Sequence, residues 1–271
     1  MKKSLKLMGI VSALILTLGL SAGCSQQNTS KVEKVLKVGV TAGPHAEIMD
    51  VVKKVADKNG LKIQVVEFND YIQPNVALSQ GDIDVNSFQH GPYLENIIKD
   101  RKYDLVPLAK TVIFPMGIYS TKIKNITDLP QGAIVAVPND PTNGGRALLL
   151  LEKVNVIKLK PGAGLNATVT DIIENPKNIT IKELDAAQIP RSLADIDLAA
   201  INTNYAITAG LVPTKDAIAV EDSNSPYANI LVIRTKDKEA PAMQQLIKAY
   251  HSDEVKAFIQ EHFKGSVAVA W

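Results

Sequence analysis

Residues 133–154 read AIVAVPNDPTNGGRALLLLEKV, and this stretch decides the fold class. Ala133–Val137 is a short apolar run of the kind found in buried strands, and Ala147–Val154 predicts a leucine-rich helix. Turn-forming residues separate the two segments. A buried strand followed at once by a helix is the repeating unit of an α/β protein, so we expect an α/β architecture.

The same strand and helix signals continue on both sides of this stretch. Apolar runs predict strands, and apolar residues at helical spacing predict helices. The predicted strands are Leu36–Val40, Leu61–Phe68, Ile83–Phe88, an interrupted stretch Thr111–Ser120, Thr180–Leu184, Leu198–Asn202 and Ile230–Thr235. The predicted helices include Ile48 to Val55, Ile72–Ser79 and Tyr93–Lys99, with one or two more in Ala240–Phe263. This alternation predicts parallel sheets with right-handed crossovers.

The pattern restarts after Pro115, which predicts two α/β lobes in one chain. We place one lobe at residues 36–115 plus 223–271 and the other at residues 116–222. The strand from Ile230 onward is followed only by terminal helices, which indicates that the chain returns to the first lobe. The chain is long enough to give each lobe a core of its own.

The first 24 residues have the order of residues found in a lipoprotein export signal. Three lysines among residues 2–6 precede an apolar run at residues 7–20, and Ser21-Ala22-Gly23 leads to Cys24, the only cysteine. The apolar run is shorter than the about 20 residues that cross a bilayer. The stretch resembles a bacterial lipobox, which implies a signal peptide at residues 1–23 and fatty acyl chains such as palmitate on Cys24. The alternative is an ordinary cleaved signal with an incidental thiol.

Residues 24–35 follow as a polar segment without apolar periodicity, which predicts a lipidated flexible tether. Removing residues 1–23, which hold three lysines and no acidic residue, leaves 27 basic and 28 acidic residues. Such a balance gives no reason to expect a nucleic-acid partner. We therefore expect a folded body held by its lipid at the cell membrane, on the extracytoplasmic face.

The segment Pro138–Arg146 (PNDPTNGGR) is the densest candidate site in the chain. It follows a strand and precedes a helix, and open α/β sheets bind ligands at the carboxyl ends of their strands. A helix N-terminus offers N–H groups and partial positive charge to an anion. Arg146 adds a planar fork that can hold a carboxylate. The alternative is a glycine turn followed by a surface arginine. The spacing fits neither a phosphate loop nor a dinucleotide site.

Three further clusters combine aromatic, imidazole and amide side chains after predicted strands. They read NSFQHGPY at residues 86–93, INTNY at residues 201–205 and SPYAN at residues 225–229. Phe88 and His90 lie on the same side of an extended chain, which favours a shared site. The alternatives are core aromatic residues, Asx turns and helix caps, which account for most such side chains.

Catalytic signals are weak in this sequence. It has no nucleophile elbow, and its one thiol is the predicted lipid attachment site. The four histidines show no metal-ligand spacing with one another. We therefore expect neither an enzyme nor a bound metal or cofactor.

Four segments carry a family resemblance: NSFQHGPYL (86–94), VPNDPTNGGRALLLL (137–151), INTNYAITAGL (201–211) and DSNSPYANILVI (222–233). Together with the lipobox, they resemble the methionine-binding lipoproteins of ABC importers, the MetQ/NlpA family. The resemblance implies a two-lobed periplasmic-binding-protein fold of type II that closes on one methionine in the cleft between its lobes. It also implies a monomer whose partners are an importer permease and its ATPase.

The resemblance also implies which residues hold the ligand. An aromatic cage for the thioether maps to Phe68, Tyr71, Phe88, His90 and Tyr93. The ligand carboxylate maps to Arg146, and polar contacts to the amino-acid head map to Asn143, Asn204 and Asn229, with Tyr227 alongside. Independently, aromatic rings make favourable contacts with sulfur of roughly 0.3–1.5 kcal/mol each, which suits a thioether ligand.

Other functions remain open at this point. The same pocket could take a methionine-containing dipeptide such as Gly-Met, or another apolar amino acid. A surface interaction lipoprotein that retains a vestigial pocket is a further alternative. The sequence does not discriminate L-methionine from D-methionine, because the two place the same groups differently around one carbon.

Overall fold

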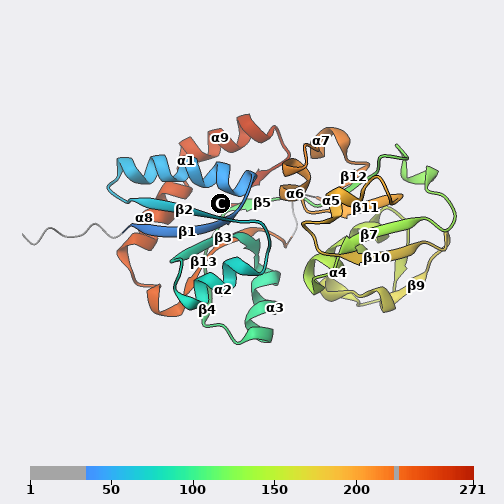
Figure 1. The fold of residues 1–271 in the computed structure, drawn as a ribbon, viewed down its shortest axis with the longest axis horizontal. Helices are drawn as coiled ribbons and strands as arrows, with labels where there is room; N and C mark the ends of the chain where they lie inside the picture. The colour runs from blue at the N-terminus through green and yellow to red at the C-terminus, as the bar shows by residue number, and fades with distance from the viewer. Residues whose placement is uncertain (1–34, 223–225) are drawn as a thin grey trace, which may run out of the picture. The chain divides into compact units, whose positions relative to one another are not determined.

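A computed structural model describes residues 35–222 and 226–271 (Figure 1). The predicted signal peptide, Cys24 and all of the predicted tether except Val35 lie outside the described residues. Two five-stranded sheets organise the described chain. The first sheet has the strand order β2-β1-β3-β13-β4. Its strands are β1 (Leu36–Thr41), β2 (Ile63–Phe68), β3 (Val85–His90), β4 (Leu105–Lys110) and β13 (Asn229–Arg234).

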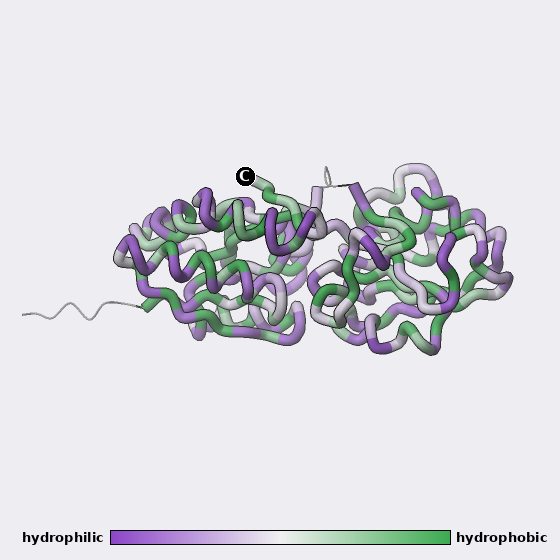
Figure 2. The backbone as a smooth tube through the Cα atoms, turned by 90° about the horizontal axis from the view of Figure 1, so that it is seen from above, coloured by the Kyte–Doolittle hydropathy of each residue, from purple (hydrophilic) through white to green (hydrophobic). Residues whose placement is uncertain are grey.

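Helices cover both faces of the first sheet. One face packs against α1 (Pro44–Lys58), α8 (Pro241–Tyr250) and α9 (Asp253–Phe263) through a large apolar cluster that includes Ile48, Leu246 and Ile259. The other face packs against α2 (Gln73–Gln80) and α3 (Gly91–Arg101) through Leu78 and Leu94. Figure 1 shows α1 and α9 on one side of this sheet and α2 and α3 on the other. Hydrophilic and hydrophobic residues alternate along the helical parts of the tube in Figure 2, as amphipathic packing requires.

The second sheet has the strand order β10-β7-β11-β6-β12. Its strands are β6 (Gly117–Tyr119), β7 (Ile134–Pro138), β10 (Thr180–Leu184), β11 (Leu198–Ile201) and β12 (Ala219–Val220). Helix α4 (Pro141–Lys153) packs on one face through Leu148 and Leu151. A second apolar cluster packs Ile189 of α5 (Ile189–Ser192) and Ala206 of α6 (Thr203–Thr208) against Ala199 and Ile201 of β11.

Short elements complete the described chain. They are β5 (Val112–Ile113) paired with β14 (Ala268–Val269), β8 (Lys158–Leu159) paired with β9 (Ile172–Glu174), helix α7 (Pro213–Asp216), and the 3-10 turns η1 (Ile126–Asp128), η2 (Gly164–Asn166), η3 (Val169–Asp171) and η4 (Thr235–Asp237). No helix in the described part of the chain is both long enough and apolar enough to cross a membrane.

The prediction of parallel sheets is wrong for part of each sheet. Strand β1 runs parallel to β2 and β3, and β7 runs parallel to β10 and β11. Strand β13, however, runs antiparallel to both of its neighbours, and β6 runs antiparallel to β11. Both exceptions enter their sheet from the other sheet, without the helical crossover that makes successive strands parallel. Strand β13 lies between β3 and β4 of the first sheet, although it follows the strands of the second sheet in the sequence.

Helix α4 begins at Pro141 rather than at Ala147, because the turn-like residues before Ala147 are helical. Asp140 is the N-cap and accepts a hydrogen bond from the Asn143 backbone N–H, and Pro141 occupies the first helical position. Gly144 and Gly145 allow other backbone segments of the protein to approach this helix closely. A Cβ at Gly145 would lie 2.5 Å from the Leu165 carbonyl oxygen, so η2 packs directly on this helix.

Candidate functional site

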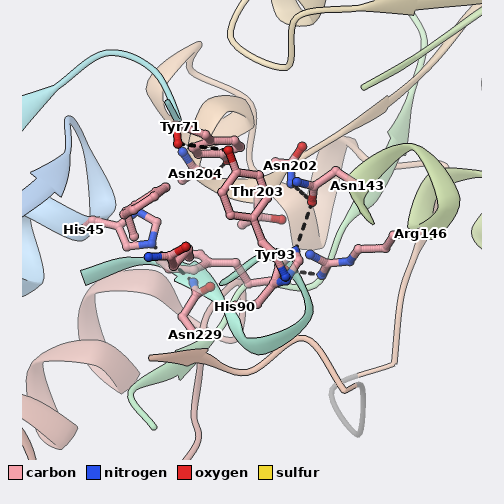
Figure 3. Close-up of a pocket in the computed structure, with 13 residues that line it drawn as sticks. His45, Tyr71, His90, Tyr93, Asn143, Arg146, Asn202, Thr203, Asn204 and Asn229 are labelled. Carbon is pink, nitrogen blue, oxygen red and sulfur yellow. Dashed lines mark hydrogen bonds between the residues drawn. The ribbon is translucent and has the colours of Figure 1, made fainter. Parts of the chain in front are cut away.

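A cavity lies among the ends of elements from both sheets, and Figure 3 shows the side chains that converge on it. Aromatic rings, amides and one guanidinium make up most of the lining. The lining residues are His45, Tyr71, Phe88, Gln89, His90, Tyr93, Phe114, Asn143, Arg146, Asn202, Thr203, Asn204 and Asn229.

The structure brings together most of the residues predicted to bind the ligand. Those that line the cavity are Tyr71, Phe88, His90, Tyr93, Asn143, Arg146, Asn204 and Asn229. Phe68 does not line it, because its ring packs with the apolar cluster under α2 and α3. Tyr227 lies behind the cavity, where its ring centroid is 4.3 Å from Cζ of Arg146 and 5.0 Å from the His90 ring. The sequence prediction missed His45, Gln89, Phe114, Asn202 and Thr203.

Three aromatic rings form a continuous wall from the first sheet and its connections. Ring centroids lie 5.9 Å apart for Tyr71 and Phe88, and 6.1 Å apart for Tyr93 with each of them. The Tyr93 hydroxyl donates to the Tyr71 carbonyl oxygen at 2.9 Å, which fixes both residues. Burial raises the pKa of both phenols, so the wall is uncharged. Such a wall suits an apolar or polarisable side chain.

His90 ends β3 and is held in one tautomer. Its Nδ1 accepts from the Tyr93 backbone N–H at 3.1 Å, and its Nε2 lies 3.3 Å from Oδ1 of Asn143. Because an amide oxygen only accepts, Nε2 carries the proton. Burial, with the nearby Arg146 charge, lowers the pKa of His90 to about 3. The ring is therefore neutral at physiological pH.

His45, in the first turn of α1, is also buried and hydrogen-bonded at both ring nitrogens. Nδ1 lies 2.7 Å from the Thr41 hydroxyl, and Nε2 lies 3.3 Å from Nδ2 of Asn229, the first residue of β13. The ring packs on Phe114 with centroids 4.5 Å apart. Burial lowers the pKa of His45 to about 3. Since Nε2 accepts from the Asn229 amide, the amide oxygen of Asn229 is turned away from the ring.

A chain of amides crosses the opposite side of the cavity. Nδ2 of Asn143 donates to the Asp140 carboxylate, and Oδ1 of Asn143 accepts from Nδ2 of Asn202 at 2.8 Å. The protein itself therefore satisfies the Asn143 amide, and Asp140 supplies an anion at the N-terminus of α4. Oδ1 of Asn202 is buried and finds no hydrogen-bond partner among the described residues. It is an acceptor available to a ligand.

Asn204, on α6, provides the complementary donor. The Tyr71 hydroxyl donates to its Oδ1 at 2.6 Å, which orients the amide. Nδ2 of Asn204 is buried without a hydrogen-bond partner in residues 35–222 and 226–271. An unsatisfied buried donor costs about 1–3 kcal/mol, so the site favours a ligand that accepts this hydrogen bond. The cavity thus offers one amide donor and one amide acceptor, as a zwitterion requires.

Arg146 lines the cavity, but part of its fork is already in use. Nε donates to both carboxylate oxygens of Glu221, at 2.9 and 3.0 Å. Nη2 donates to the Phe114 carbonyl oxygen at 2.8 Å and also to Glu221. The sequence predicted that the fork would hold a ligand carboxylate, yet in the structure its Nε–Nη2 edge holds the carboxylate of Glu221. Among the described residues only Nη1 of this guanidinium has no hydrogen-bond partner, so Nη1 is the group available to a ligand.

Comparison with known proteins identifies the family. A family model described as NlpA lipoprotein matches residues 36–271. The chain belongs to the NlpA lipoprotein family. Among curated relatives, the D-methionine-binding lipoproteins MetQ of Salmonella typhimurium and Escherichia coli are each 51% identical over 269 residues, covering 98% of both chains. The family resemblance predicted from the four sequence segments is confirmed.

Solved structures of similar proteins share the fold. A nutrient-binding protein from Burkholderia cenocepacia, solved bound to methionine, is 58% identical, with a TM-score of 0.86 over 88% of this chain and 100% of its own. A crystal structure of the methionine-binding protein MetQ is 52% identical, with a TM-score of 0.85 over 87% of this chain and 98% of its own. The predicted two-lobed α/β binding-protein fold of type II is confirmed.

The chemistry of this NlpA-family cavity is that of binding. Both ring nitrogens of His45 and of His90 are engaged by protein groups, so neither ring presents a free nitrogen as a general base. Within the described residues, no three side chains of His, Asp or Glu converge in a way that could hold a metal ion. The cavity instead presents apolar rings on one side and unsatisfied amide groups on the other.

Proposed function

We propose that this protein captures methionine outside the cytoplasmic membrane and delivers it to the permease and ATPase of an ABC importer. Membership of the NlpA lipoprotein family supports this proposal, as do the names of the MetQ relatives. The observation that carries it is the match to the Burkholderia cenocepacia protein, which is 58% identical and was solved bound to methionine. At this identity, a cavity built from rings and amides is expected to take the same class of ligand.

The contacts of the cavity suit the parts of methionine. The thioether would lie against Tyr71, Phe88 and Tyr93, where sulfur–aromatic contacts contribute roughly 0.3–1.5 kcal/mol each. The carboxylate would accept from Nη1 of Arg146 and Nδ2 of Asn204. The ammonium group would donate to amide oxygens, of which that of Asn202 is unsatisfied. Asn143 would then act by orienting Asn202 and His90 rather than by touching the ligand.

We assign residues 36–115 and 223–271 to one lobe and residues 116–222 to the other, so that the cavity lies in the cleft between them. Closing the cleft would exclude water from the ligand and give the permease a distinct surface to recognise. The mature protein would act as a monomer and would catalyse no reaction.

Mass spectrometry of the ligand released from protein purified without added amino acids tests this function. We expect methionine at close to one equivalent, and a chiral separation then assigns its L or D form. Release of a Gly-Met dipeptide or of another apolar amino acid would show that the protein captures that ligand instead. No bound ligand, together with no thermal shift on adding any amino acid, would favour a surface interaction protein with a vestigial pocket.

The lipid anchor at Cys24 is a separate part of the proposal and lies outside the described residues. The family is named for lipoproteins, which supports attachment to a membrane. We expect Cys24→Ser to abolish incorporation of a labelled fatty acid and to leave methionine affinity unchanged, because the tether separates the anchor from the folded body. If the variant still incorporates label and fractionates with membranes, Cys24 is not the attachment site.

A further inference from the structure

We propose that Glu221 sets the charge selectivity of the cavity, so that it accepts a net-neutral zwitterion and rejects the corresponding anion. Glu221 does not line the cavity, and its side chain is paired with the one guanidinium that does. The inference rests on the proposed function, because it concerns which charge state of a methionine-like ligand is bound. Glu221 would act through Arg146 and is therefore a positioning residue.

The pairing is built into the fold. The side chain of Arg146 is 3% exposed and that of Glu221 is 13% exposed, so the ion pair is shielded from solvent. Arg146 comes from α4, whereas Glu221 follows β12. The Glu221 carboxylate also accepts from the Met116 backbone N–H at 3.1 Å, and Arg146 also donates to the Phe114 carbonyl oxygen. Both partners are thus held by backbone groups as well as by each other, which fixes their separation.

The other charges around the cavity explain why Glu221 would affect ligand binding. Both lining histidines are neutral, and the phenols of the aromatic wall are uncharged. The charged groups on the polar side are Arg146, its partner Glu221, and Asp140, whose carboxylate accepts from Thr142 and Asn143. Asp70 and Asp185 also act on the Tyr93 phenol. Without Glu221, Arg146 would have no carboxylate of the described residues within hydrogen-bond distance. With it, the Arg146 charge is matched before any ligand enters.

The charges of Arg146 and Glu221 also act on the neighbouring phenol of Tyr227. Tyr227 stacks on the Arg146 guanidinium, and the charges of Arg146 and Glu221 act on its pKa in opposite directions, while burial raises it to about 12. The charges of Arg146 and Glu221 would also act in opposite directions on a ligand carboxylate near Nη1. A zwitterion carries its own ammonium group and needs no excess positive charge from the site. An anion that lacks the ammonium group binds well only where the site carries excess positive charge, and Glu221 removes most of that excess.

The test compares two ligands in matched variants by titration calorimetry. The ligands are methionine and its α-hydroxy analogue, which keeps the thioether and carboxylate but lacks the ammonium group. We expect wild type to prefer methionine. In Glu221→Gln, the ratio of the two dissociation constants should shift toward the hydroxy acid by on the order of tenfold, because removing one charge a few ångströms away strengthens anion binding at an effective dielectric constant of about 20. Asp222→Asn is the matched control, since Asp222 is 79% exposed and pairs with Lys153.

An unchanged ratio in Glu221→Gln, or an equal shift in Asp222→Asn, overturns the proposal. If Glu221→Gln does not fold, Glu221→Asp keeps the negative charge beside Arg146 on a side chain one methylene shorter. Its ratio should stay within about threefold of wild type, because no net charge is lost. A tenfold shift there would also overturn the proposal. Failure of the proposed function is distinct, since wild type would then not bind methionine at all.

Discussion

The two sides of the cavity differ in chemistry, and the difference follows the two sheets. The first sheet and its connections contribute the rings of Tyr71, Phe88 and Tyr93, the two neutral histidines, and the amides of Gln89 and Asn229. Elements of the second sheet contribute Arg146 and the amides of residues 143, 202 and 204. One side is therefore uncharged and rich in aromatic rings, and the other carries the guanidinium and most of the amides. We call them the aromatic wall and the polar wall.

This division separates recognition of a ligand's side chain from recognition of its amino-acid head. Contacts in the aromatic wall are diffuse, and each contributes a fraction of a kcal/mol to about 1.5 kcal/mol. Contacts in the polar wall are directional, and losing a buried one leaves a partner unsatisfied. Variants of the polar wall should therefore weaken every amino acid alike, whereas variants of the aromatic wall should change which amino acid is preferred.

The largest effect on binding is expected at Arg146. Arg146→Ala should weaken methionine binding by about 2–5 kcal/mol, because the ligand carboxylate stays buried without its charged partner. Arg146→Lys keeps the charge but loses the planar fork and should fall between wild type and Arg146→Ala. Titration calorimetry measures both, and thermal melting checks that each variant folds. Wild-type affinity in Arg146→Ala would show that Arg146 does not contribute to ligand binding.

A second effect concerns the two histidines of the aromatic side. Their folded pKa values of about 3 lie below the unfolded value of about 6.5, so the unfolded chain binds more protons between these values. Stability should be full above pH 6.5 and fall as the pH drops toward 3. Between pH 7.5 and 4.5, each histidine should lower the free energy of unfolding by about 2.7 kcal/mol.

Urea unfolding at the two pH values measures this loss. In His45→Gln, the histidine contribution to the loss should fall by about half, because only His90 of this pair remains. The same pH dependence in wild type and His45→Gln would show that the His45 ring is protonated in the folded protein.

A smaller effect is expected where the two walls touch. The Tyr71 hydroxyl donates to Oδ1 of Asn204, so Tyr71→Phe leaves that amide without its orienting partner. We expect methionine and norleucine both to bind more weakly, each by about 0.5–1.5 kcal/mol, because the change acts on the head of the ligand. Tyr103→Phe, in the apolar cluster under α2 and α3, is the matched control. Calorimetry that finds weaker binding for only one of the two ligands would contradict the division of roles.

The smallest effect is a change of selectivity at Phe88. Norleucine replaces the methionine sulfur by a methylene, so only sulfur–aromatic contacts separate the two ligands. Phe88→Leu should reduce the preference for methionine over norleucine by roughly 0.3–1.5 kcal/mol. Competition against bound methionine measures the preference, with Phe258→Leu on α9 as a control. A wild-type protein that binds norleucine as well as methionine would make the pocket a general apolar site.

Local sequence signals predicted most of the fold because most elements are set by local patterns. Strands β1, β7 and β10 fall within a residue or two of their predicted bounds. Strand β4 (Leu105–Lys110) was missed, and Pro107 in its middle explains why. Proline is tolerated in strands at sheet edges, and β4 is an edge strand of the first sheet. That position depends on the sheet order, which no local pattern encodes.

Local sequence signals also predicted only part of the candidate site. Phe88, His90 and Arg146 follow strands or begin helices, so their neighbours in sequence indicated a site. His45 was missed because its role depends on Thr41 and on Asn229, which is distant in the sequence. Glu221 was missed because its partner Arg146 is 75 positions away. Pairings between distant segments arise only when the chain folds, so they could not be predicted from one sequence.

The orientation of the ligand between the two walls is the most direct test of this account. Protein freed of bound ligand by unfolding and refolding can be crystallised with selenomethionine as the ligand, and anomalous diffraction then locates its selenium. We predict a selenium position among the rings of Tyr71, Phe88 and Tyr93, with the carboxylate toward Arg146 and Asn204. A selenium position beside Arg146, with the amino-acid head against the aromatic wall, would contradict the account.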